Sequence, residues 1–524
     1  MFRPEHEPPG GPAVPAPVWS VDPRTGKQRE QVTVEATAED VDRVVRAAHA
    51  ARGTLADRTV RAALLRTAAE LLAAETEKLV ATADAETALG TARLTGELGR
   101  TTYQLRAFAD LVDEGGYLDV RIDHADPALA PPRPDLRRYK VPLGVVAVYS
   151  ASNFPLAFSV PGGDTASALA AGCPVVVKAH PDHPATSELA AAALRAAAER
   201  VGLPADIVGL VHGFEAGVAL VRHELVAAAG FTGSIRGGRA LFDAAAARPR
   251  PIPFHGELGS LNPVVVTAAA ADERAEQIGA GLAASMTLGA GQFCVKPGLV
   301  LAPAGESGDR LVASLAEAVD ATADGVLLDS RMRDAFVAGA RERAELPEVE
   351  APVRPGPGDE HTVSAGFLTV PAARLAEGGP YDLLLEECFG PVTVIARYTD
   401  DSEVGAALGR LAGNLTATVQ LGADECAGTD GAGRGARLLA DLTPLAGRLL
   451  VNGWPTGVAV APAQHHGGPY PATTSTSTSV GGTAIERWLR PVAYQDTPDA
   501  LLPEELREAN PQRLPRQVDG VREG

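Results

Sequence analysis

Residues 144–180 read GVVAVYSASNFPLAFSVPGGDTASALAAGCPVVVKAH and contain two short apolar runs on either side of a segment rich in small residues. The runs GVVAVYSA (144–151) and PVVVKAH (174–180) are typical of strands that are buried on both faces of a sheet. The segment between them (155–172) favours a helix that crosses from one strand to the next. This order predicts a parallel strand–helix–strand unit, and therefore an α/β fold.

The same alternation continues on both sides of this stretch. Strands are predicted at 206–213, 226–233 and 251–259, with helices between them, so that the region forms a parallel sheet of the nucleotide-binding type. A second series of strands, NPVVVTAA, LVLAP, FLTVPA and VTVIARY, begins after Asn262 and predicts a second α/β unit. Upstream, residues 38–111 have the apolar spacing of several amphipathic helices.

Two segments depart from this layered pattern. Residues 117–142, YLDVRIDHADPALAPPRPDLRRYKVP, predict strands joined by a long proline-rich turn, and PVAYQ near the C-terminus predicts another strand. Such an arm could pair with another subunit or form a plain surface hairpin. The first 18 residues, rich in proline and glycine, and the polar, proline-punctuated residues 497–524 predict terminal extensions.

The composition excludes several classes of function. A formal charge of −19 would repel nucleic acid, so no nucleic-acid partner is expected. The four cysteines lie far apart, without a CxxC or CxxH pair, which argues against a disulfide framework and favours a reducing compartment. The sequence begins without a secretory leader and contains no apolar stretch long enough to span a membrane. We therefore expect a cytoplasmic protein.

A candidate nucleophile lies in residues 285–298, SMTLGAGQFCVKPG. Cys294 follows a helical pattern and a glycine-rich turn, so little side-chain bulk would keep a substrate from its sulfur. By residue statistics alone, a buried structural cysteine is the commoner case. Oxidation of an aldehyde by a nicotinamide needs a nucleophile, donors for an oxyanion and a base that activates water. The interpretation of Cys294 therefore depends on the other two groups.

Asn153 and Glu257 are candidates for those two groups. Asn153, in SASNFP directly after a strand, offers an amide N–H₂ to an oxyanion, although asparagine before proline is also a common turn residue. Glu257, in HGELG at a strand end, is either one surface charge among many or a buried base. Its small and apolar neighbours favour burial, which should raise its pKa toward that of a useful base.

The cofactor candidates are weaker signals. The FTGS turn (231–234) ends a strand and opens a helix, so that backbone N–H groups and a hydroxyl could hold a diphosphate. Lys178 ends the strand PVVVK and would face the ligand crevice of an α/β sheet or simply extend into solvent. The sequence GAGLAA (279–284) lies within a helical pattern and is therefore not a dinucleotide fingerprint.

Taken together, SASNFP, PVVVKAH, FTGS, ELGSLNP, GAGQFCVKPG and EECFGPV resemble the motifs of NAD(P)-dependent aldehyde dehydrogenases, in the same order and over nearly the whole chain. The resemblance implies that Cys294 is the nucleophile and Glu257 the general base. It also implies that Asn153 and the Cys294 backbone N–H form an oxyanion hole. The cofactor contacts implied in the same way are Lys178, Thr232, Gly233, Ser234, Glu387 and Phe389.

The fold implied by this resemblance has three parts. A Rossmann-like cofactor domain would comprise residues 19–116 and 143–259, and a catalytic α/β domain residues 260–462. A β-strand oligomerisation arm would comprise residues 117–142 and 480–496. A homo-oligomer, either a dimer or a tetramer, is therefore expected.

The segments ASNFPLAFSVPGGDTASALAAG, GAGQFCVKPG and QHHGGPYPATTSTSTSVG resemble one subfamily in particular, the 2,5-dioxovalerate (α-ketoglutaric semialdehyde) and NADP-dependent fatty aldehyde dehydrogenases. The implied reaction converts 2,5-dioxovalerate to 2-oxoglutarate through a thiohemiacetal and a thioester on Cys294. A medium- or long-chain fatty aldehyde is the alternative substrate. A CoA-acylating or acyl-transferring enzyme is the alternative of a different class, and Glu257 argues against it.

Three further features of the sequence bear on the cofactor, the substrate and a metal. NAD-preferring relatives carry a glutamate where this chain has Pro181, so nothing acidic is expected to repel a 2′-phosphate, and NADP is favoured over NAD. Lys296 would attract an anionic substrate or, as the safer interpretation, face solvent. His465-His466 and the pair His180/His183 have no carboxylate at ligand spacing in the sequence, so no metal site is predicted.

Overall fold

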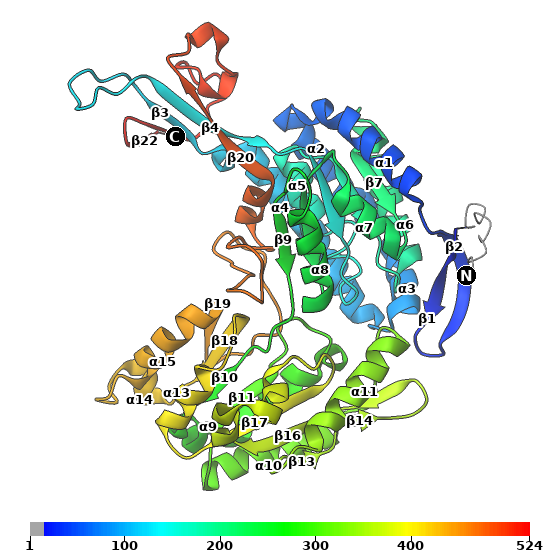
Figure 1. Ribbon diagram of the computed structural model, residues 1–524, viewed down its shortest axis with the longest axis vertical. Helices are drawn as coiled ribbons and strands as arrows, with labels where there is room; N and C mark the ends of the chain where they lie inside the picture. The colour runs from blue at the N-terminus through cyan, green and yellow to red at the C-terminus, as the bar shows by residue number, and fades with distance from the viewer. Residues whose placement is uncertain (1–14, 524) are drawn as a thin grey trace, which may run out of the picture.

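The computed structural model describes residues 15–523 and places them in two α/β bodies with a projecting arm (Figure 1). The first body contains a five-stranded sheet in the order β7-β6-β5-β8-β9, in which every neighbouring pair is parallel. The strand–helix–strand unit predicted from residues 144–180 is thereby confirmed. The strands are β5 (Val145–Tyr149), β6 (Val175–Lys178), β7 (Val208–Val211), β8 (Val226–Thr232) and β9 (Phe254–Glu257).

Helices surround this first sheet, as the alanine-rich segments between the strands predict. Four come from the N-terminal region and four connect the strands. They are α1 (Ala38–Ala51), α2 (Arg58–Ala74), α3 (Thr76–Thr87), α4 (Thr91–Glu114), α5 (Gly163–Ala171), α6 (Pro184–Arg200), α7 (Phe214–Arg222) and α8 (Ile235–Ala246).

One helix is shorter than the sequence predicts. Residues 155–172 were expected to be helical throughout, but α5 begins only at Gly163. The preceding residues form turns because the Glu97 carboxylate on α4 accepts the backbone N–H groups of Leu156 (2.8 Å) and Ala157 (2.9 Å). Pro161, which has no N–H to donate, also disfavours a helix here.

The second body contains a seven-stranded sheet in the order β13-β16-β17-β11-β10-β18-β19, parallel except for β13. It confirms the predicted second α/β series. Its strands are β10 (Val264–Val266), β11 (Leu299–Pro303), β13 (Glu350–Val353), β16 (Gly366–Pro371), β17 (Val392–Tyr398), β18 (Asn414–Gln420) and β19 (Ala446–Val451). A small sheet beside it contains β12 (Gly325–Val326), β14 (Gly356–Pro357) and β15 (Thr362–Ser364).

The helices of the second body include α9, which contains residues 279–284 and so confirms that GAGLAA is not a strand-to-helix turn. Apolar clusters pack on the seven-stranded sheet. The helices are α9 (Ala268–Thr287), α10 (Glu306–Asp320), α11 (Ser330–Ala344), α12 (Ala372–Glu377), α13 (Asp401–Leu408), α14 (Ala423–Ala427) and α15 (Arg434–Leu442).

The arm is a separate five-stranded sheet in the order β20-β4-β3-β21-β22. Its strands β3 (Val120–Asp123) and β4 (Leu136–Pro142) are joined by a long turn, as predicted, and β20 (Leu489–Gln495) pairs with β4. The C-terminal residues add β21 (Arg516–Val518) and β22 (Val521–Glu523) to the same sheet. The sequence of this tail is polar overall, and the prediction of an extension gave no weight to its leucines. The structure buries three of them, which holds the tail on the arm: Leu502, Leu506 and Leu514.

Most of the predicted N-terminal extension, residues 1–18, lies outside the described residues. The described part enters strand β1 (Pro17–Asp22), which pairs with β2 (Lys27–Val34). Within residues 15–523, no helix is long and apolar enough to cross a membrane. The chain crosses from the first body to the second between β9 and β10, and the candidate active site lies at this crossing.

Candidate active site

Cys294 lies in the loop between α9 and β11, as the sequence predicts for a helix that ends in glycines. A short 3₁₀ turn, Leu288–Gly291, reverses the chain, and Gly291 has a φ of +69°. A Cβ at Gly291 would lie 2.3 Å from the backbone of Gly390, so this loop packs directly on the EECFGP segment. The half-buried Cys294 side chain packs beside Val295 and other apolar residues.

Asn262 holds the cysteine loop in place. Its Nδ2 donates to the backbone carbonyls of Cys294 (2.8 Å) and Lys296 (3.0 Å). Its Oδ1 accepts from Ser260 Oγ (2.8 Å) and from the backbone N–H of Thr416 on β18 (3.2 Å). The motif ELGSLNP contains Asn262, but sequence reasoning gave this residue no role, because its partners are distant in the chain.

The structure brings Glu257 and Cys294 together and adds His466, which sequence reasoning missed. Glu257 ends β9 and is 2% exposed, and His466 is 1% exposed. The His466 Nε2 atom lies 2.9 Å from Glu257 Oε1 and 3.6 Å from Cys294 Sγ. Only the contact with sulfur has hydrogen-bond geometry, because Oε1 has no hydrogen-bond partner among the described residues. His466 therefore links the predicted nucleophile to the predicted base.

These contacts correct two expectations about the site. The first expectation was that no carboxylate accompanies His466. In the structure Glu257 does so, and possible metal-ligand atoms of Glu257, Cys294 and His466 all lie within 4.8 Å of one another. The second expectation concerned the pKa of Glu257, which burial on its own would raise, as predicted. The positive charge of His466, the hydrogen bond from Ser479 and the charge of Arg487 outweigh burial and leave that pKa below its usual value. The predicted upward shift was wrong because the sequence did not reveal His466.

The cysteine has the opposite shift. Burial and the charge of Glu257 raise the pKa of the Cys294 thiol well above its ordinary range. The thiol is therefore protonated at neutral pH and needs an adjacent proton acceptor to become a nucleophile. His466 and Glu257 lie next to the thiol. The arrangement suits a nucleophile that is activated by neighbouring bases rather than by a low pKa of its own.

Asn153, predicted as an oxyanion donor, lies beside the cysteine loop. Its Nδ2 donates to the backbone carbonyl of Gln292 (3.0 Å), two residues before Cys294. A primary amide has two N–H bonds, so the second remains available. The backbone N–H of Cys294 also has no acceptor among residues 15–523. Both N–H groups lie in or beside the cysteine loop, and such donors are what charge developing on a carbonyl oxygen needs.

Lys178 ends β6 and packs against α7, where a Cβ at Gly217 would lie 3.5 Å from its Cγ. Burial lowers the pKa of Lys178 to about 8, and the carboxylates of Asp182 and Glu35 oppose that shift. The expectation that nothing acidic lies here was therefore wrong. Glu35 comes from the β2–α1 link, so its position could not be recognised next to Lys178 in the sequence.

The FTGS turn connects the first sheet to α8 as predicted, but part of it is already occupied. Ser234 caps α8, and its Oγ accepts the N–H of Gly237 at 3.2 Å. The Gly233 N–H donates to the backbone carbonyl of Glu257 at 3.0 Å. Gly233 N–H is therefore not free to hold a phosphate, and it instead ties the turn to the strand that carries the base.

Glu387 lies close to the end of β9, since a Cβ at Gly259 would be 2.5 Å from its Oε2 atom. Burial raises the pKa of Glu387 to about 7, and Lys296 opposes that shift. Lys296 is 3% exposed, and its Nζ donates to the carbonyls of Cys388 (3.2 Å) and Val392 (2.5 Å). The expectation that Lys296 faces solvent was wrong, and its attraction of an anionic substrate stays a prediction. Lys296 instead fastens the loop that carries Glu387 and the half-buried Phe389.

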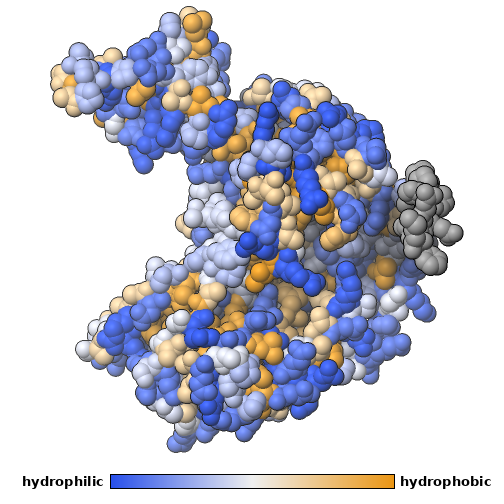
Figure 2. Space-filling model, viewed as in Figure 1, coloured by the Kyte–Doolittle hydropathy of each residue, from blue (hydrophilic) through white to orange (hydrophobic). Residues whose placement is uncertain are grey.

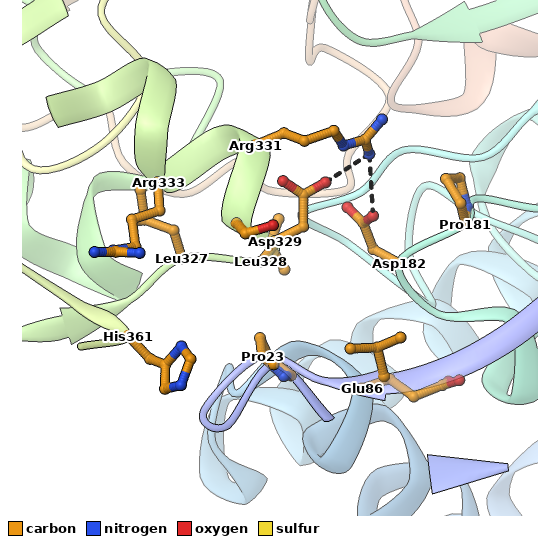
Figure 3. Close-up of a pocket in the computed structure, with 13 residues that line it drawn as sticks. Pro23, Glu86, Pro181, Asp182, Leu327, Leu328, Asp329, Arg331, Arg333 and His361 are labelled. Atoms are coloured by element: carbon orange, nitrogen blue, oxygen red, sulfur yellow. Dashed lines mark hydrogen bonds and ion pairs between the residues drawn. The ribbon is translucent and has the colours of Figure 1, made fainter. Parts of the chain in front are cut away.

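A cavity of about 440 Å³ lies beyond Lys178, between the first and second bodies (Figure 3). Arg331 on α11 forms ion pairs there with Asp329 (2.6 Å) and, more weakly, with Asp182 (3.8 Å). The cavity does not include the cysteine. It is lined by Val21, Pro23, Gly26, Glu86, Pro181, Asp182, Leu327, Leu328, Asp329, Ser330, Arg331, Arg333 and His361.

The donor set fits a nicotinamide dinucleotide. Lys178 lies at the carboxyl end of β6, and the N-terminus of α8 follows the carboxyl end of β8. These two strands flank β5 in the first sheet, and the carboxyl ends of such strands are where α/β folds bind nucleotides. Glu387, an acceptor for ribose hydroxyls, lies next to the far end of the same sheet over Gly259, where the missing side chain leaves room. These residues would hold the cofactor along the edge that leads to Cys294.

Comparisons with known proteins identify the family of this chain. The family model described as the aldehyde dehydrogenase family matches residues 15–420. Alpha-ketoglutaric semialdehyde dehydrogenase 2 from Azospirillum brasilense is 50% identical over 472 residues, which cover 88% of this chain and 87% of the relative. Alpha-ketoglutaric semialdehyde dehydrogenase from Acinetobacter baylyi is 43% identical over 457 residues, covering 85% and 84% of the two chains.

Solved structures share the fold. An E. coli NADP-dependent enzyme has a TM-score of 0.76 at 24% identity, over 91% of this chain and 94% of its own. An NAD-dependent benzaldehyde dehydrogenase from Corynebacterium glutamicum has a TM-score of 0.74 at 23% identity, over 93% and 96% of the two chains. The predicted combination of two α/β bodies with a strand arm is confirmed. With a family match over most of its length and relatives this similar, the chain belongs to the aldehyde dehydrogenase family and is an NAD(P)-dependent aldehyde dehydrogenase.

Proposed function

We propose that this enzyme oxidises 2,5-dioxovalerate to 2-oxoglutarate and that NADP⁺ is its favoured cofactor. Pro181, in the place where NAD-preferring relatives carry a glutamate, supports the cofactor, and the carboxylates of Asp182 and Glu35 near Lys178 limit that preference. The observation that carries the substrate is the pair of α-ketoglutaric semialdehyde dehydrogenases, 50% and 43% identical over more than four fifths of the chain. The cluster of Cys294, His466 and Glu257 supports the chemistry. A fatty aldehyde is not favoured by these relatives, and a buried Glu257 beside the thiol favours hydrolysis over transfer to CoA.

The proposed reaction begins with a proton transfer from Cys294 to the ionised carboxylate of Glu257 in the same cluster, which frees the sulfur to attack the aldehyde carbon. The carbonyl oxygen becomes an oxyanion and accepts hydrogen bonds from the Cys294 N–H and from Asn153 Nδ2. When bound, the oxidised nicotinamide supplies the acceptor for the hydrogen that leaves the substrate carbon. Lys178 and Glu387 would orient its two ribose units.

The second half of the proposed reaction releases the acid. After oxidation, the substrate carbon remains attached to Cys294 as a thioester. Glu257 accepts a proton from a water molecule, whose oxygen attacks this carbon and displaces the sulfur. A lowered pKa keeps the Glu257 carboxyl ionised at neutral pH, so that it is ready to accept this proton. His466 stabilises that ionised form and lies within reach of the departing thiolate.

We expect steady-state kinetics to favour 2,5-dioxovalerate over a long-chain aldehyde such as dodecanal, with NADP⁺ as the acceptor. The measurement is kcat/KM for both aldehydes with NADP⁺ and with NAD⁺. A clear preference for dodecanal would contradict the proposed substrate while leaving the chemistry at Cys294 intact. A clear preference for NAD⁺ would contradict the proposed cofactor.

Glu35 should limit the preference for NADP⁺, because its carboxylate lies near Lys178, where a 2′-phosphate would be held. We expect Glu35→Gln to raise the ratio of kcat/KM for NADP⁺ over NAD⁺ by roughly threefold to tenfold, as expected for one partly solvated charge pair. Glu30→Gln, on the exposed face of β2, is the matched control and should leave the ratio unchanged. An unchanged or lower ratio in Glu35→Gln would contradict this role.

We also propose that the arm joins copies of this chain into a homo-oligomer. Strand β20 lies at one edge of the arm sheet, and β19 lies at one edge of the seven-stranded sheet. Figure 2 shows an open hollow between the arm and the second body. Strand edges with free hydrogen-bonding groups on both sides of such a hollow are suited to pairing with another subunit. Light scattering of the purified protein would test this assembly, and a monomer would contradict it.

A further inference from the structure

We propose that Arg100 on α4 binds a carboxylate at the far end of the aldehyde substrate and makes the site selective for short aldehydes that carry such a group. This role rests on the proposed function, because it presupposes oxidation of an aldehyde at Cys294. It identifies a specificity residue that lies far in the sequence from every motif of the reaction.

One face of α4 is fixed against the turn that follows Asn153. Arg93, Glu97 and Arg100 have the i, i+4, i+7 spacing that places side chains on the same side of a helix. Glu97 is buried and accepts the N–H groups of Leu156 (2.8 Å) and Ala157 (2.9 Å). The two arginines on either side of Glu97 are therefore held beside the aromatic residues that surround the cysteine.

Arg93 is engaged in supporting the oxyanion donor. Its guanidinium carbon lies 4.5 Å from the ring centroid of Phe293 and 5.1 Å from that of Phe154. Its Nη2 donates to the backbone carbonyl of Asn153 at 2.7 Å. This hydrogen bond and the two rings, which pack edge to face, fix both the position of Arg93 and that of the residue that carries the amide donor. The Nε and Nη1 atoms of Arg93 are buried without an acceptor among the described residues.

Arg100 lacks such a partner. Its guanidinium carbon lies 5.1 Å from the ring centroid of Phe158, whose ring in turn lies 6.1 Å from that of His466. Within residues 15–523, the Arg100 guanidinium forms no hydrogen bond or ion pair, and its Nη2 atom is buried without an acceptor. A desolvated cation without a partner is unfavourable, and a carboxylate is the group that satisfies it best.

The charges around the cysteine point to the same residue. Burial lowers the pKa of Arg100, and the charges of Glu97, Cys294 and Glu257 oppose that shift, so the guanidinium lies within electrostatic reach of both reacting groups. Arg448 also lies within electrostatic reach of Cys294. Its two Nη atoms, however, already donate to the carbonyls of Pro455 (2.6 Å) and Gly457 (2.9 Å). Arg448 is therefore committed to its own loop.

The side of α4 that carries Arg100 is open to solvent. Gly96 lies between the two arginines on this side and is exposed, and a Cβ there would meet no atom within 4 Å. No side chain at position 96 therefore separates the row of cations from solvent. A short aldehyde with a terminal carboxylate would place its charge on Arg100 while its carbonyl carbon meets Cys294. An apolar chain in the same place would leave Arg100 unpaired, which disfavours fatty aldehydes.

The test compares a charged aldehyde with its uncharged counterpart of equal chain length. The substrates are 5-oxopentanoate and pentanal, with 2,5-dioxovalerate as a third, each at saturating NADP⁺. We expect Arg100→Met to lower kcat/KM for the two carboxylated aldehydes by roughly 10- to 100-fold, as for loss of a charged hydrogen bond, and mainly through KM. The effect on pentanal should be far smaller, so the preference for 5-oxopentanoate over pentanal collapses.

Two further variants keep this test decisive. Arg106→Met removes a cation from the exposed face of the same helix and should leave the preference intact. Arg100→Lys keeps the charge and should restore part of the preference. An equal loss for all three aldehydes, or an unchanged preference in Arg100→Met, would overturn the role of Arg100. A wild-type enzyme that oxidises none of them would instead contradict the proposed function itself.

Discussion

Cys294→Ala is expected to lower kcat/KM for aldehyde oxidation by at least about 10⁴-fold, because the adduct that gives up its hydrogen can no longer form. The alanine removes only the sulfur, and the loop itself is held by Asn262 and by the packing of Gly291 on Gly390. Cofactor binding should therefore persist. The measurement is NADPH formation at 340 nm, roughly the absorbance maximum of any reduced nicotinamide, together with cofactor binding by fluorescence.

A matched control is available for this variant. Cys426 is exposed and lies away from the cluster, so Cys426→Ala should retain wild-type turnover. Substantial oxidation by Cys294→Ala, with the cofactor still bound, would show that another residue is the nucleophile. Loss of activity in both variants would instead indicate damage unrelated to the reacting sulfur.

Glu257→Gln should separate the two halves of the reaction. The first half needs a proton acceptor for the thiol. Glutamine leaves His466 without the carboxylate that favours its charged form, so His466 Nε2, 3.6 Å from the sulfur, can serve as that acceptor. The second half needs a base for water, which glutamine cannot provide. We expect a burst of about one NADPH per active site, followed by turnover slowed by roughly 10²- to 10⁴-fold, the usual contribution of a general base. Stopped-flow absorbance measures both phases.

The burst distinguishes hydrolysis from the earlier steps. Cys294→Ala is the control and should show neither a burst nor turnover. Slow oxidation without a burst in Glu257→Gln would mean that Glu257 acts mainly in activating the thiol. Full steady-state turnover in Glu257→Gln would remove Glu257 from the hydrolytic step altogether.

Local sequence pattern was sufficient to predict the layers of the fold. Short apolar runs separated by alanine-rich segments gave the parallel strands β5 and β6, and a glycine-rich helix end located Cys294. These features depend on neighbouring residues and so can be recognised in the sequence. The length of α5 was overestimated at its N-terminal end. Glu97, which is distant in the sequence, accepts the backbone N–H groups that a longer helix would use.

The unpredicted parts of the site are contacts between distant residues. His466 meets Glu257 across more than two hundred residues, and that contact reversed the expected pKa shift. Lys296 was expected at the surface, yet it crosses to the loop after Glu387 and is buried there. Glu35 approaches Lys178 from the link before α1. Such contacts cannot be recognised from a local sequence pattern, because they join residues that are distant in the sequence and become neighbours only in the folded chain.

The most direct test of the proposed mechanism is intact-protein mass spectrometry of Glu257→Gln, quenched in acid shortly after mixing with 2,5-dioxovalerate and NADP⁺. The mechanism predicts an added mass equal to one 2-oxoglutaryl group, located on the peptide that contains Cys294 and removed by hydroxylamine. The same experiment on the Cys294→Ala, Glu257→Gln double variant should show no added mass. An unmodified Cys294 peptide during the burst, or an acyl group on a different residue, would contradict a thioester at Cys294 that Glu257 hydrolyses.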